Sequence, residues 1–141
     1  MLVTETVIDV RYPDADAMGI VHHAVYPVWY EIARMDFFEK AGFGYTVMKE
    51  FGVDAAMVNL NMNYRSPVRY PGHVCVTTGI RSFAPRKLEL EYTVFCGGAA
   101  VADATSFHVW TGPDMRAFSI RDNLPDIYAL IEAAGEKNHI R

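Results

Sequence analysis

The sequence predicts an α+β fold in which a curved antiparallel β-sheet wraps around one long α-helix. A stretch with helical character follows the first predicted strand, and four segments of alternating apolar and polar residues follow that helix. Turn signals separate the later segments at short intervals, so these strands are predicted to form hairpins and an antiparallel meander. With one long helix and a run of antiparallel strands, the sheet has to curl around the helix to bury it.

Length and composition set the size and class of the protein. Its 141 residues, 51% of them hydrophobic, predict one compact domain over residues 1–141. The longest stretch without Asp, Glu, Lys or Arg covers residues 17–30, which is too short to span a bilayer. The net charge is −4 and the Lys and Arg residues are scattered, which argues against nucleic acid as a partner. The N-terminal residues lack the basic segment of a secretion signal, so a cytoplasmic location is expected.

The long helix is predicted within residues 24–41. It is expected to begin near Tyr26, because Pro27 is then in the first turn, where its missing N–H costs nothing. Gly42 supplies the stop. Residues 24–30 carry no charge over nearly two turns, so this end of the helix is expected to be covered on all sides, by the sheet or by another subunit.

The remaining elements follow from their patterns. The first strand, residues 2–11, is rich in Val, Ile and Thr and ends before Pro13. Three later strands are each predicted to place one set of residues on a single face: Val58, Leu60, Met62 and Tyr64; Val74, Val76, Thr78 and Ile80; and Leu88, Leu90, Tyr92 and Val94. A fourth, more apolar strand covers residues 99–110. Short helices are predicted over residues 45–51 and, with amphipathic character, over residues 125–136.

Several chemically active side chains are predicted to have structural roles. Glu31 and Arg34 lie three residues apart on the helix, so a local ion pair is expected, and on a wrapped helix they have to be paired or at a subunit interface. Cys75 and Cys96 are expected to be reduced and half-buried, with a disulfide as the less favoured alternative. His108, in an apolar strand, is expected to be a core residue with its hydrogen bonds satisfied.

The segment that is most informative about function precedes the long helix. Residues 12–26 bring Asp14, Asp16, His22 and His23 to the helix N-terminus, where unpaired N–H groups and the positive end of the helix dipole lie. One interpretation is that an aspartate caps the helix or shapes the loop. The other is acyl transfer, in which N–H groups hold an oxyanion and a carboxylate acts as nucleophile or activates water. No metal site is expected, because adjacent side chains such as the two histidines point apart in regular structure.

A resemblance to a known family rests on this segment. The chain reads Asp14-x-Asp16-x-x-Gly19-x-Val21-x-His23-x-x-Tyr26, followed by Glu31-x-x-Arg34. This pattern resembles the signature of the 4-hydroxybenzoyl-CoA thioesterase family of hotdog-fold acyl-CoA thioesterases, and most closely its branch of Tol-Pal-associated acyl-CoA thioesterases. The resemblance implies the hotdog fold and the hydrolysis of an acyl-CoA to free acid and coenzyme A, without a cofactor.

The resemblance also implies roles for individual residues. Asp16 matches the catalytic carboxylate that attacks the thioester carbonyl or activates water, and the backbone N–H of His23 matches the group that polarises this carbonyl. Arg86 and Lys87 resemble a basic pair near the coenzyme A phosphates, and a solubilising turn is the alternative for them. The remaining positions assigned to substrate binding are Gly19, Val21 and Tyr26.

Partners and alternative functions follow from the same resemblance. It implies a homodimer or homotetramer with the substrate between subunits, and acyl carrier protein is a second possible carrier of the acyl group. A hotdog protein that binds an acyl chain or acyl carrier protein without hydrolysis is the alternative from another functional class. A hotdog dehydratase is disfavoured, because its carboxylate lies on the helix whereas Asp16 precedes it.

Overall fold

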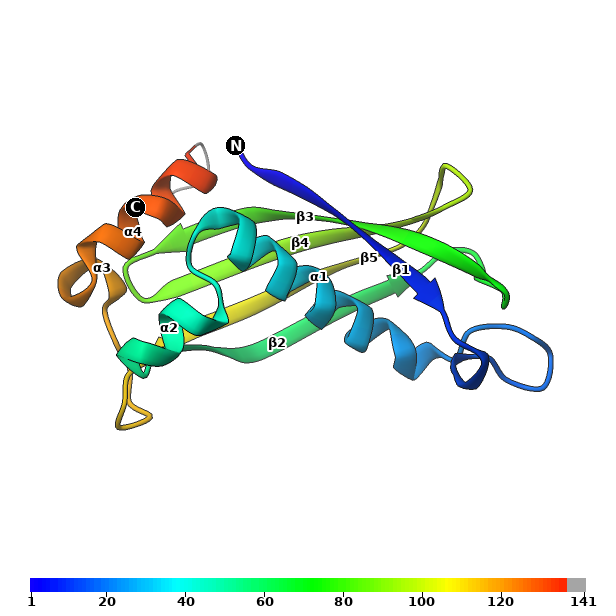
Figure 1. The fold of residues 1–141 in the computed structure, drawn as a ribbon, viewed down its shortest axis with the longest axis horizontal. Helices are drawn as coiled ribbons and strands as arrows, with labels where there is room; N and C mark the ends of the chain where they lie inside the picture. The colour runs from blue at the N-terminus through cyan, green and yellow to red at the C-terminus, as the bar shows by residue number, and fades with distance from the viewer. Residues whose placement is uncertain (137–141) are drawn as a thin grey trace.

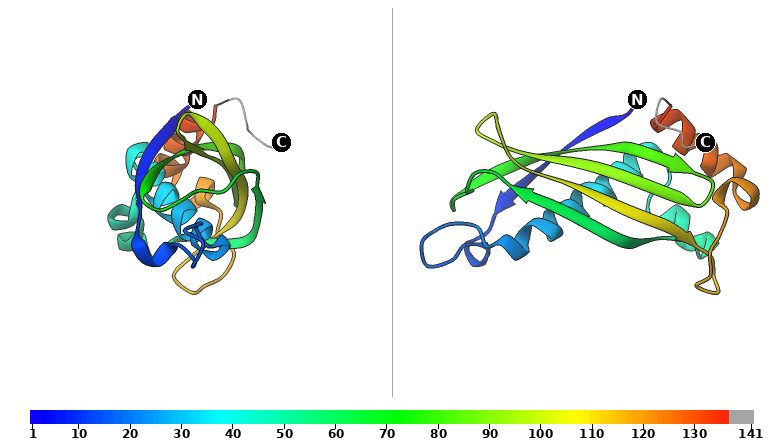
Figure 2. Two further views of the ribbon diagram at one scale, coloured as in Figure 1. Left: turned by 90° about the vertical axis from the view of Figure 1, so that its right-hand side faces the viewer. Right: turned by 180° about the vertical axis from the view of Figure 1, so that it is seen from behind.

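The computed structural model describes residues 1–136 and contains a five-stranded antiparallel sheet with the order β1-β3-β4-β5-β2 (Figure 1). The sheet curls around helix α1 (Tyr26–Ala41), as the left-hand view of Figure 2 shows. The strands are β1 (Val3–Val10), β2 (Asp54–Tyr64), β3 (Gly72–Ala84), β4 (Lys87–Cys96) and β5 (Ala99–Thr111). The predicted α+β fold class, a curved antiparallel sheet around one long helix, is confirmed.

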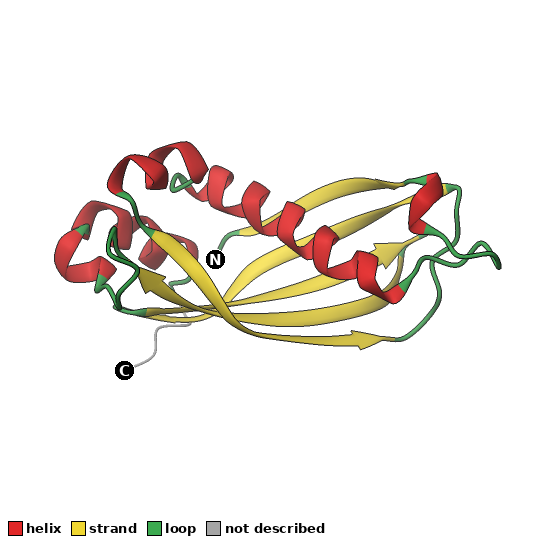
Figure 3. Cartoon of the chain, turned by 90° about the horizontal axis from the view of Figure 1, so that it is seen from below, coloured by secondary structure: helices red, strands yellow, loops and turns green. Residues whose placement is uncertain are grey.

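Helix α1 begins and ends where the sequence predicts. Pro27 is in its first turn, where the absent N–H has no intrahelical acceptor to lose. Gly42 follows the last residue in the left-handed conformation, with φ 96°, and its N–H donates to the carbonyl groups of Glu39 and Phe38. One face of the helix packs on the concave side of the sheet (Figure 3). The buried residues on this face are Tyr26, Trp29, Tyr30, Ala33, Phe37 and Phe38.

The opposite face of α1 is open to solvent. Val28, Ile32 and Met35 follow one another at helical spacing and are 48%, 44% and 38% exposed. The expectation that the charge-free end of the helix is covered on all sides is therefore wrong for a single chain, because the sheet covers only one side of α1. Cover by a second subunit stays a prediction.

The central strands match their predicted faces. The alternating series of β3 and of β4 are all buried, and β3, β4 and β5 form a meander. The placement of β2 differs from the prediction, since it pairs with β5 at the far edge and not with β3. The connection over residues 65–71 is too long for a tight hairpin and lets the chain cross to the other side of the sheet. Val58 also differs, because a bulge between Met57 and Asn59 turns it out of its predicted face and leaves it 57% exposed.

The helices other than α1 gather at one end of the sheet. Helix α2 (Tyr45–Phe51) has its predicted bounds, and the predicted C-terminal helix is α4 (Pro125–Ala134). The single turn α3 (Ile120–Asn123) was not predicted, because four residues carry no periodic signal. Helices α2, α3 and α4 lie at the end of the molecule away from the loop before α1 (Figure 1). None of the helices in residues 1–136 is long and apolar enough to cross a bilayer.

Candidate active site

The loop before α1 contains a buried aspartate. Asp14 is 3% exposed, and its two carboxylate oxygens accept hydrogen bonds from the backbone N–H and the guanidinium of Arg11, at 2.8 and 3.0 Å. These contacts close the short 3-10 helix Tyr12–Asp14. Both oxygens of Asp14 therefore shape the loop, so its role is structural.

Asp16 lies at the exposed tip of the same loop. Its Oδ1 accepts hydrogen bonds from the backbone N–H groups of Met18 and Ile20, at 2.8 and 3.2 Å, so this oxygen organises the loop. Its Oδ2 accepts no hydrogen bond from residues 1–136. Neither aspartate caps α1, because the residue at the cap position is Val25, so of the two structural interpretations the loop turn is correct and the helix cap is wrong. One oxygen shapes the turn, and the other is unpaired among the described residues.

Gly19 makes the return of this loop possible. It has φ +74°, a conformation that L-residues with a side chain rarely adopt. Its N–H donates to the Asp16 carbonyl oxygen at 2.9 Å, and its own carbonyl accepts from the Tyr70 N–H at 3.1 Å. The Asp16 N–H donates in turn to the carbonyl of Ile20 at 2.9 Å, which holds Asp16 beside the returning strand-like segment.

His23 begins a short 3-10 helix, His23–Val25, that leads directly into α1. The hydroxyl of Tyr64 donates to the His23 carbonyl at 3.0 Å and fixes this peptide unit. The backbone N–H of His23 has no acceptor in the described part of the chain. It is therefore a free donor near the positive end of the α1 dipole, the type of group that stabilises an oxyanion.

The two adjacent histidines do not point apart. The rings of His22 and His23 stack at 4.3 Å between centroids, because the residues lie at the irregular entry to the helix and not within regular structure. His22 Nδ1 accepts from the Ala24 N–H at 3.2 Å and caps the 3-10 turn. The prediction that these two side chains point apart, and so cannot bind one metal ion together, is thus wrong. Residues 1–136 nevertheless contain no cluster of three groups able to hold a metal ion.

A groove of about 280 Å³ lies next to this loop. It brings together three of the predicted site residues, Val21, His23 and Tyr26, whereas Asp16 and Gly19 belong to the loop that borders it. Burial raises the pKa of Tyr26, so its phenol stays neutral. Sequence reasoning placed Tyr64 on a strand face and assigned it no role in the site. The other residues that line the groove are Ile20, Tyr64, Arg65, Ser66 and Pro67.

Arg86 and Lys87 are not part of this groove. Arg86 lies in the β3–β4 turn and Lys87 begins β4, and both border a separate depression with Arg121, at the end of the sheet near α3. Strand β3 begins beside the loop, since its first residue pairs with Val10, and its 13 residues span roughly 40 Å at about 3.3 Å each. Within one chain the basic pair is therefore too far from Asp16 to serve the same bound molecule.

A buried polar chain crosses the core, and sequence reasoning missed it. Arg34 donates to the Tyr92 hydroxyl at 3.1 Å, Tyr92 bonds to Ser106 at 2.6 Å, and Ser106 bonds to His108 Nε2 at 2.7 Å. His108 Nδ1 then meets the carbonyl of Ala55 at 3.2 Å. The sequence predicts an ion pair between Glu31 and Arg34, and the structure of residues 1–136 does not contain it. Arg34 donates to the Tyr92 hydroxyl instead.

Burial sets the protonation of this chain. It lowers the pKa of His108 to about 4, with the charge of Arg34 as a further cause, so His108 is neutral at pH 7. His108 is thus a core residue with both ring nitrogens satisfied, as the sequence indicates. The signal that could have found the chain is that Tyr92, Ser106 and His108 all occupy inward-facing positions of neighbouring strands.

The antiparallel sheet wrapped around one long helix is the hotdog fold, here that of a thioester hydrolase. Comparison with known proteins agrees. The sequence model of the thioesterase superfamily matches residues 18–102, and the chain belongs to this superfamily.

Individual relatives cover nearly the whole chain. A protein of Bacillus subtilis (strain 168), YneP, whose name assigns it provisionally to the acyl-CoA thioesterases, is 32% identical over 95% of this chain and 99% of its own. The DHNA-CoA thioesterase of Staphylococcus aureus is 26% identical over the full length of both chains, with a TM-score of 0.87. The hypothetical protein TT1821 of Thermus thermophilus is 35% identical over 92% of this chain and 98% of its own, with a TM-score of 0.86.

Proposed function

We propose that the protein hydrolyses an acyl-CoA to the free acid and coenzyme A at the groove beside the loop of residues 14–23. The observation that carries this proposal is the unpaired Oδ2 of Asp16 on the loop that borders the groove, together with His23, a lining residue of the groove whose N–H is free. A carboxylate and an oxyanion donor are the two groups that acyl transfer requires.

The reaction balances along two routes. In the first, Asp16 attacks the carbonyl carbon, the C–S bond breaks to release the coenzyme A thiolate, and water then cleaves the resulting anhydride. In the second, Asp16 takes a proton from a water molecule that attacks the same carbon. In both routes the His23 N–H and the α1 dipole stabilise the negative charge on the carbonyl oxygen. Tyr64 supports this geometry because its hydroxyl holds the carbonyl of the same residue, on the peptide unit that follows the free N–H.

The complete site requires a second copy of the chain. Strand β2 is an edge strand, and Met57, Val58 and Tyr64 on it are exposed. Antiparallel pairing of two β2 strands about a twofold axis brings the Asp54 end of one strand beside the Tyr64 end of the other. The strand pairing places Asp54 at the same end of the sheet as Arg86 and Lys87. At the other end of β2, the Tyr64 hydroxyl donates to the His23 carbonyl.

A homodimer of this kind places Arg86 and Lys87 of one copy near the loop of residues 14–23 of the other copy. Their positive charges then serve the phosphates of coenzyme A, which the separation within one chain does not allow. The exposed stripe Val28, Ile32 and Met35 on α1 gives such dimers a further apolar face through which two of them pair into a homotetramer. The named activity of the Staphylococcus aureus neighbour on DHNA-CoA favours coenzyme A over acyl carrier protein as the acyl carrier.

The test is thiol release from a panel of aliphatic and aromatic acyl-CoA thioesters. Asp16→Asn keeps an oxygen for the two loop N–H groups and removes the reactive carboxylate, so turnover is expected to fall about 10²-fold to 10⁴-fold while the circular dichroism stays native. The matched control is Asp114→Asn, because Asp114 accepts a similar local bond from the Arg116 N–H at 3.1 Å in a distant turn. Full turnover by Asp16→Asn would remove Asp16 from the mechanism. An acyl ligand that copurifies with a wild-type protein releasing no thiol from any thioester would instead show a non-hydrolytic acyl-binding protein.

A further inference from the structure

His22 lies between the loop of Asp16 and the 3-10 turn His23–Val25 that leads into α1. Its backbone is fixed on both sides, because its N–H donates to the Asp14 carbonyl at 2.9 Å and its carbonyl accepts from the Val25 N–H at 3.0 Å. Its side chain is exposed and can therefore exchange a proton with solvent.

The imidazole of His22 uses one ring nitrogen as a hydrogen-bond acceptor. Nδ1 accepts from the Ala24 N–H at 3.2 Å, so this nitrogen carries no proton and the ring N–H is at Nε2. The ring of His23 stacks on the His22 ring with 29° between the two planes, which limits the rotation of both. His22 thus occupies the cap position of the turn, which Ser, Thr, Asp or Asn usually fills.

His22 determines which N–H group at the entry to α1 is free. The Ala24 N–H donates to its ring, and the Val25 N–H donates to its carbonyl. The His23 N–H, between them and His22, has no acceptor in the part of the chain that the structure describes. The free donor assigned to the oxyanion is therefore held in place by two hydrogen bonds that both end on His22.

Protonation of the His22 ring removes one of these two bonds. A protonated imidazole has an N–H on each nitrogen and can only donate, so the Ala24 N–H loses its acceptor. Histidine side chains change charge between about pH 5 and 8, so the loss falls in mild acid. The turn is then held by backbone bonds alone.

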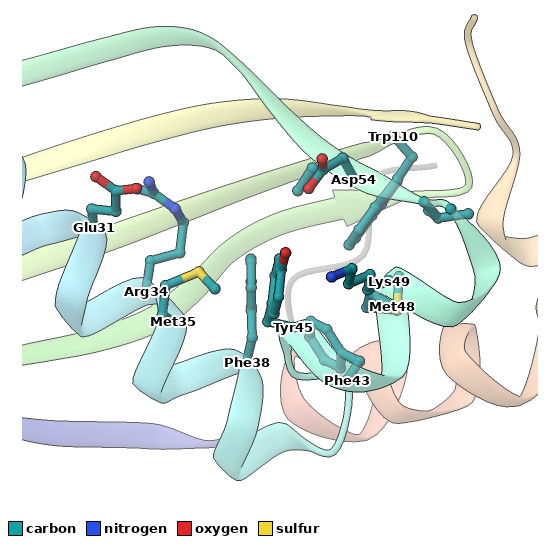
Figure 4. Close-up of a pocket in the computed structure, with 13 residues that line it drawn as sticks. Glu31, Arg34, Met35, Phe38, Phe43, Tyr45, Met48, Lys49, Asp54 and Trp110 are labelled. Carbon is teal, nitrogen blue, oxygen red and sulfur yellow. The ribbon is translucent and has the colours of Figure 1, made fainter. Parts of the chain in front are cut away.

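Other ionisable groups lie around the ring of His22. Carboxylates, phenols and guanidinium groups ordinarily keep their charge between about pH 5.5 and 7.5, so the stacked ring of His23 is the neighbour that shares this range. The remaining groups on the loop and on the segments beside it are Arg11, Asp14, Asp16, Tyr64, Arg65 and Arg69. The charged residues near the middle of α1 surround a different cavity, as Figure 4 shows for Glu31, Arg34, Lys49 and Asp54.

From these contacts we propose that His22 is a positioning residue whose unprotonated ring keeps the His23 N–H ready for the carbonyl oxygen, and whose protonation sets the acid limit of turnover. This role rests on the proposed hydrolysis at the groove, because the group that His22 positions is the oxyanion donor of that reaction. His22 touches no reacting atom and acts through the backbone of the two residues that follow it.

Two variants separate the acceptor from the ring. His22→Asn supplies an oxygen acceptor that does not titrate in mild acid, and His22→Phe keeps a ring against His23 without an acceptor. Free coenzyme A released from benzoyl-CoA and from octanoyl-CoA is quantified by chromatography. Between pH 7.5 and pH 5.5, the wild-type kcat should fall about 3-fold to 10-fold, as loss of one cap bond supplies, with little change in KM. His22→Asn should keep most of the wild-type kcat at both pH values, whereas His22→Phe should have the low kcat at both.

The matched control is His73→Asn, at an exposed histidine of β3, which should keep the wild-type pH profile. Circular dichroism at pH 5.5 checks that each protein stays folded. An acid fall that persists in His22→Asn, or a wild type without such a fall, would refute the role of His22 and leave the proposed hydrolysis standing. Full kcat in His22→Phe at pH 7.5 would do the same. A wild type that releases coenzyme A from no thioester would overturn the hydrolysis as well.

Nuclear magnetic resonance without substrate tests the contact itself. The Ala24 amide signal of the wild type should shift with pH in step with the ring signals of His22, because protonation of the ring frees this N–H. In His22→Asn the Ala24 signal should stay constant over the same range. An Ala24 signal that ignores the titration of His22 in the wild type would contradict the proposal, whether or not the protein hydrolyses a thioester.

Discussion

The N-terminal end and the middle of α1 use different structural means to present polar groups. At its N-terminal end, irregular backbone carries exposed groups such as Asp16 and His23 on one continuous loop. At its middle, regular elements bury the groups that orient Arg34, and these come from strands far apart in the sequence. The first arrangement suits chemistry, because a loop can place a carboxylate next to free N–H groups. The second holds the Arg34 guanidinium in a defined position, because a continuous chain of hydrogen bonds anchors it.

The two aspartates of the loop differ in the same way, since Asp14 is buried and fixed whereas Asp16 is exposed. The variant Asp14→Ala tests this difference. The variant removes the acceptor for the Arg11 backbone N–H and for its guanidinium, so the free energy of unfolding should fall by about 2 kcal/mol. Urea denaturation measures the change, and Asp9→Ala, at an exposed position of β1, should change it by less than about 0.5 kcal/mol. Equal losses in the two variants would show that Asp14 does not shape the loop.

The buried polar chain at the middle of α1 should make the stability of the protein sensitive to acid. Unfolded histidine has a pKa near 6.5 and folded His108 one of about 4, so below pH 6.5 only the unfolded chain takes up this proton. Between pH 7.5 and pH 5.5 this linkage should lower the free energy of unfolding by about 1.5 kcal/mol.

His108→Gln should remove most of that pH-dependent loss, as urea denaturation at the two pH values would show, whereas His73→Gln at an exposed position should keep it. The hydrogen-bonded carboxylates of Asp36 and Asp103 have lowered pKa values and lose their contribution only as the pH falls below about 3.8, outside this window. A His108→Gln variant as acid-sensitive as wild type would contradict the assignment.

Gly19→Ala separates backbone strain from function at the loop end. A methyl group would meet no atom within 4 Å among the described residues, so the cost arises from φ +74° alone and should be about 1 kcal/mol. Gly97→Ala, in the β4–β5 turn with φ +61° and the same open surroundings, should cost a similar amount. Thermal denaturation should not distinguish the two variants. Thiol release should distinguish them, because only Gly19 holds the turn that positions Asp16. Equal turnover of the two variants would argue against this role of Gly19.

The smallest expected effect concerns the basic pair. Replacing both Arg86 and Lys87 by alanine should raise KM for an acyl-CoA about 3-fold to 5-fold without changing kcat, since the lost contacts are exposed ion pairs worth under about 1 kcal/mol. The same acyl group on pantetheine, which lacks the nucleotide phosphates, should show no such rise. A rise of equal size with both thioesters would mean that the pair does not bind phosphate.

Local patterns predicted much of the fold and part of the candidate site. The ends of α1 follow from Pro27 and Gly42, and the buried faces of β3 and β4 follow from their alternation. The loop that carries Asp16, Gly19 and His23 was recognisable because these residues lie in one short segment of the sequence. The stacking of the two histidines was not, because it depends on the irregular entry to α1.

What the sequence by itself determined is therefore the five strands, the longer helices and the residues of one loop, since propensity, capping and periodicity act over a few residues. The tertiary structure decided the rest. It placed β2 at the edge beside β5, separated Arg86 and Lys87 from Asp16 by the length of the sheet, and joined Arg34 to His108 through two strands. Each of these depends on contacts between residues far apart in the chain, and no local pattern encodes which distant segments pack together.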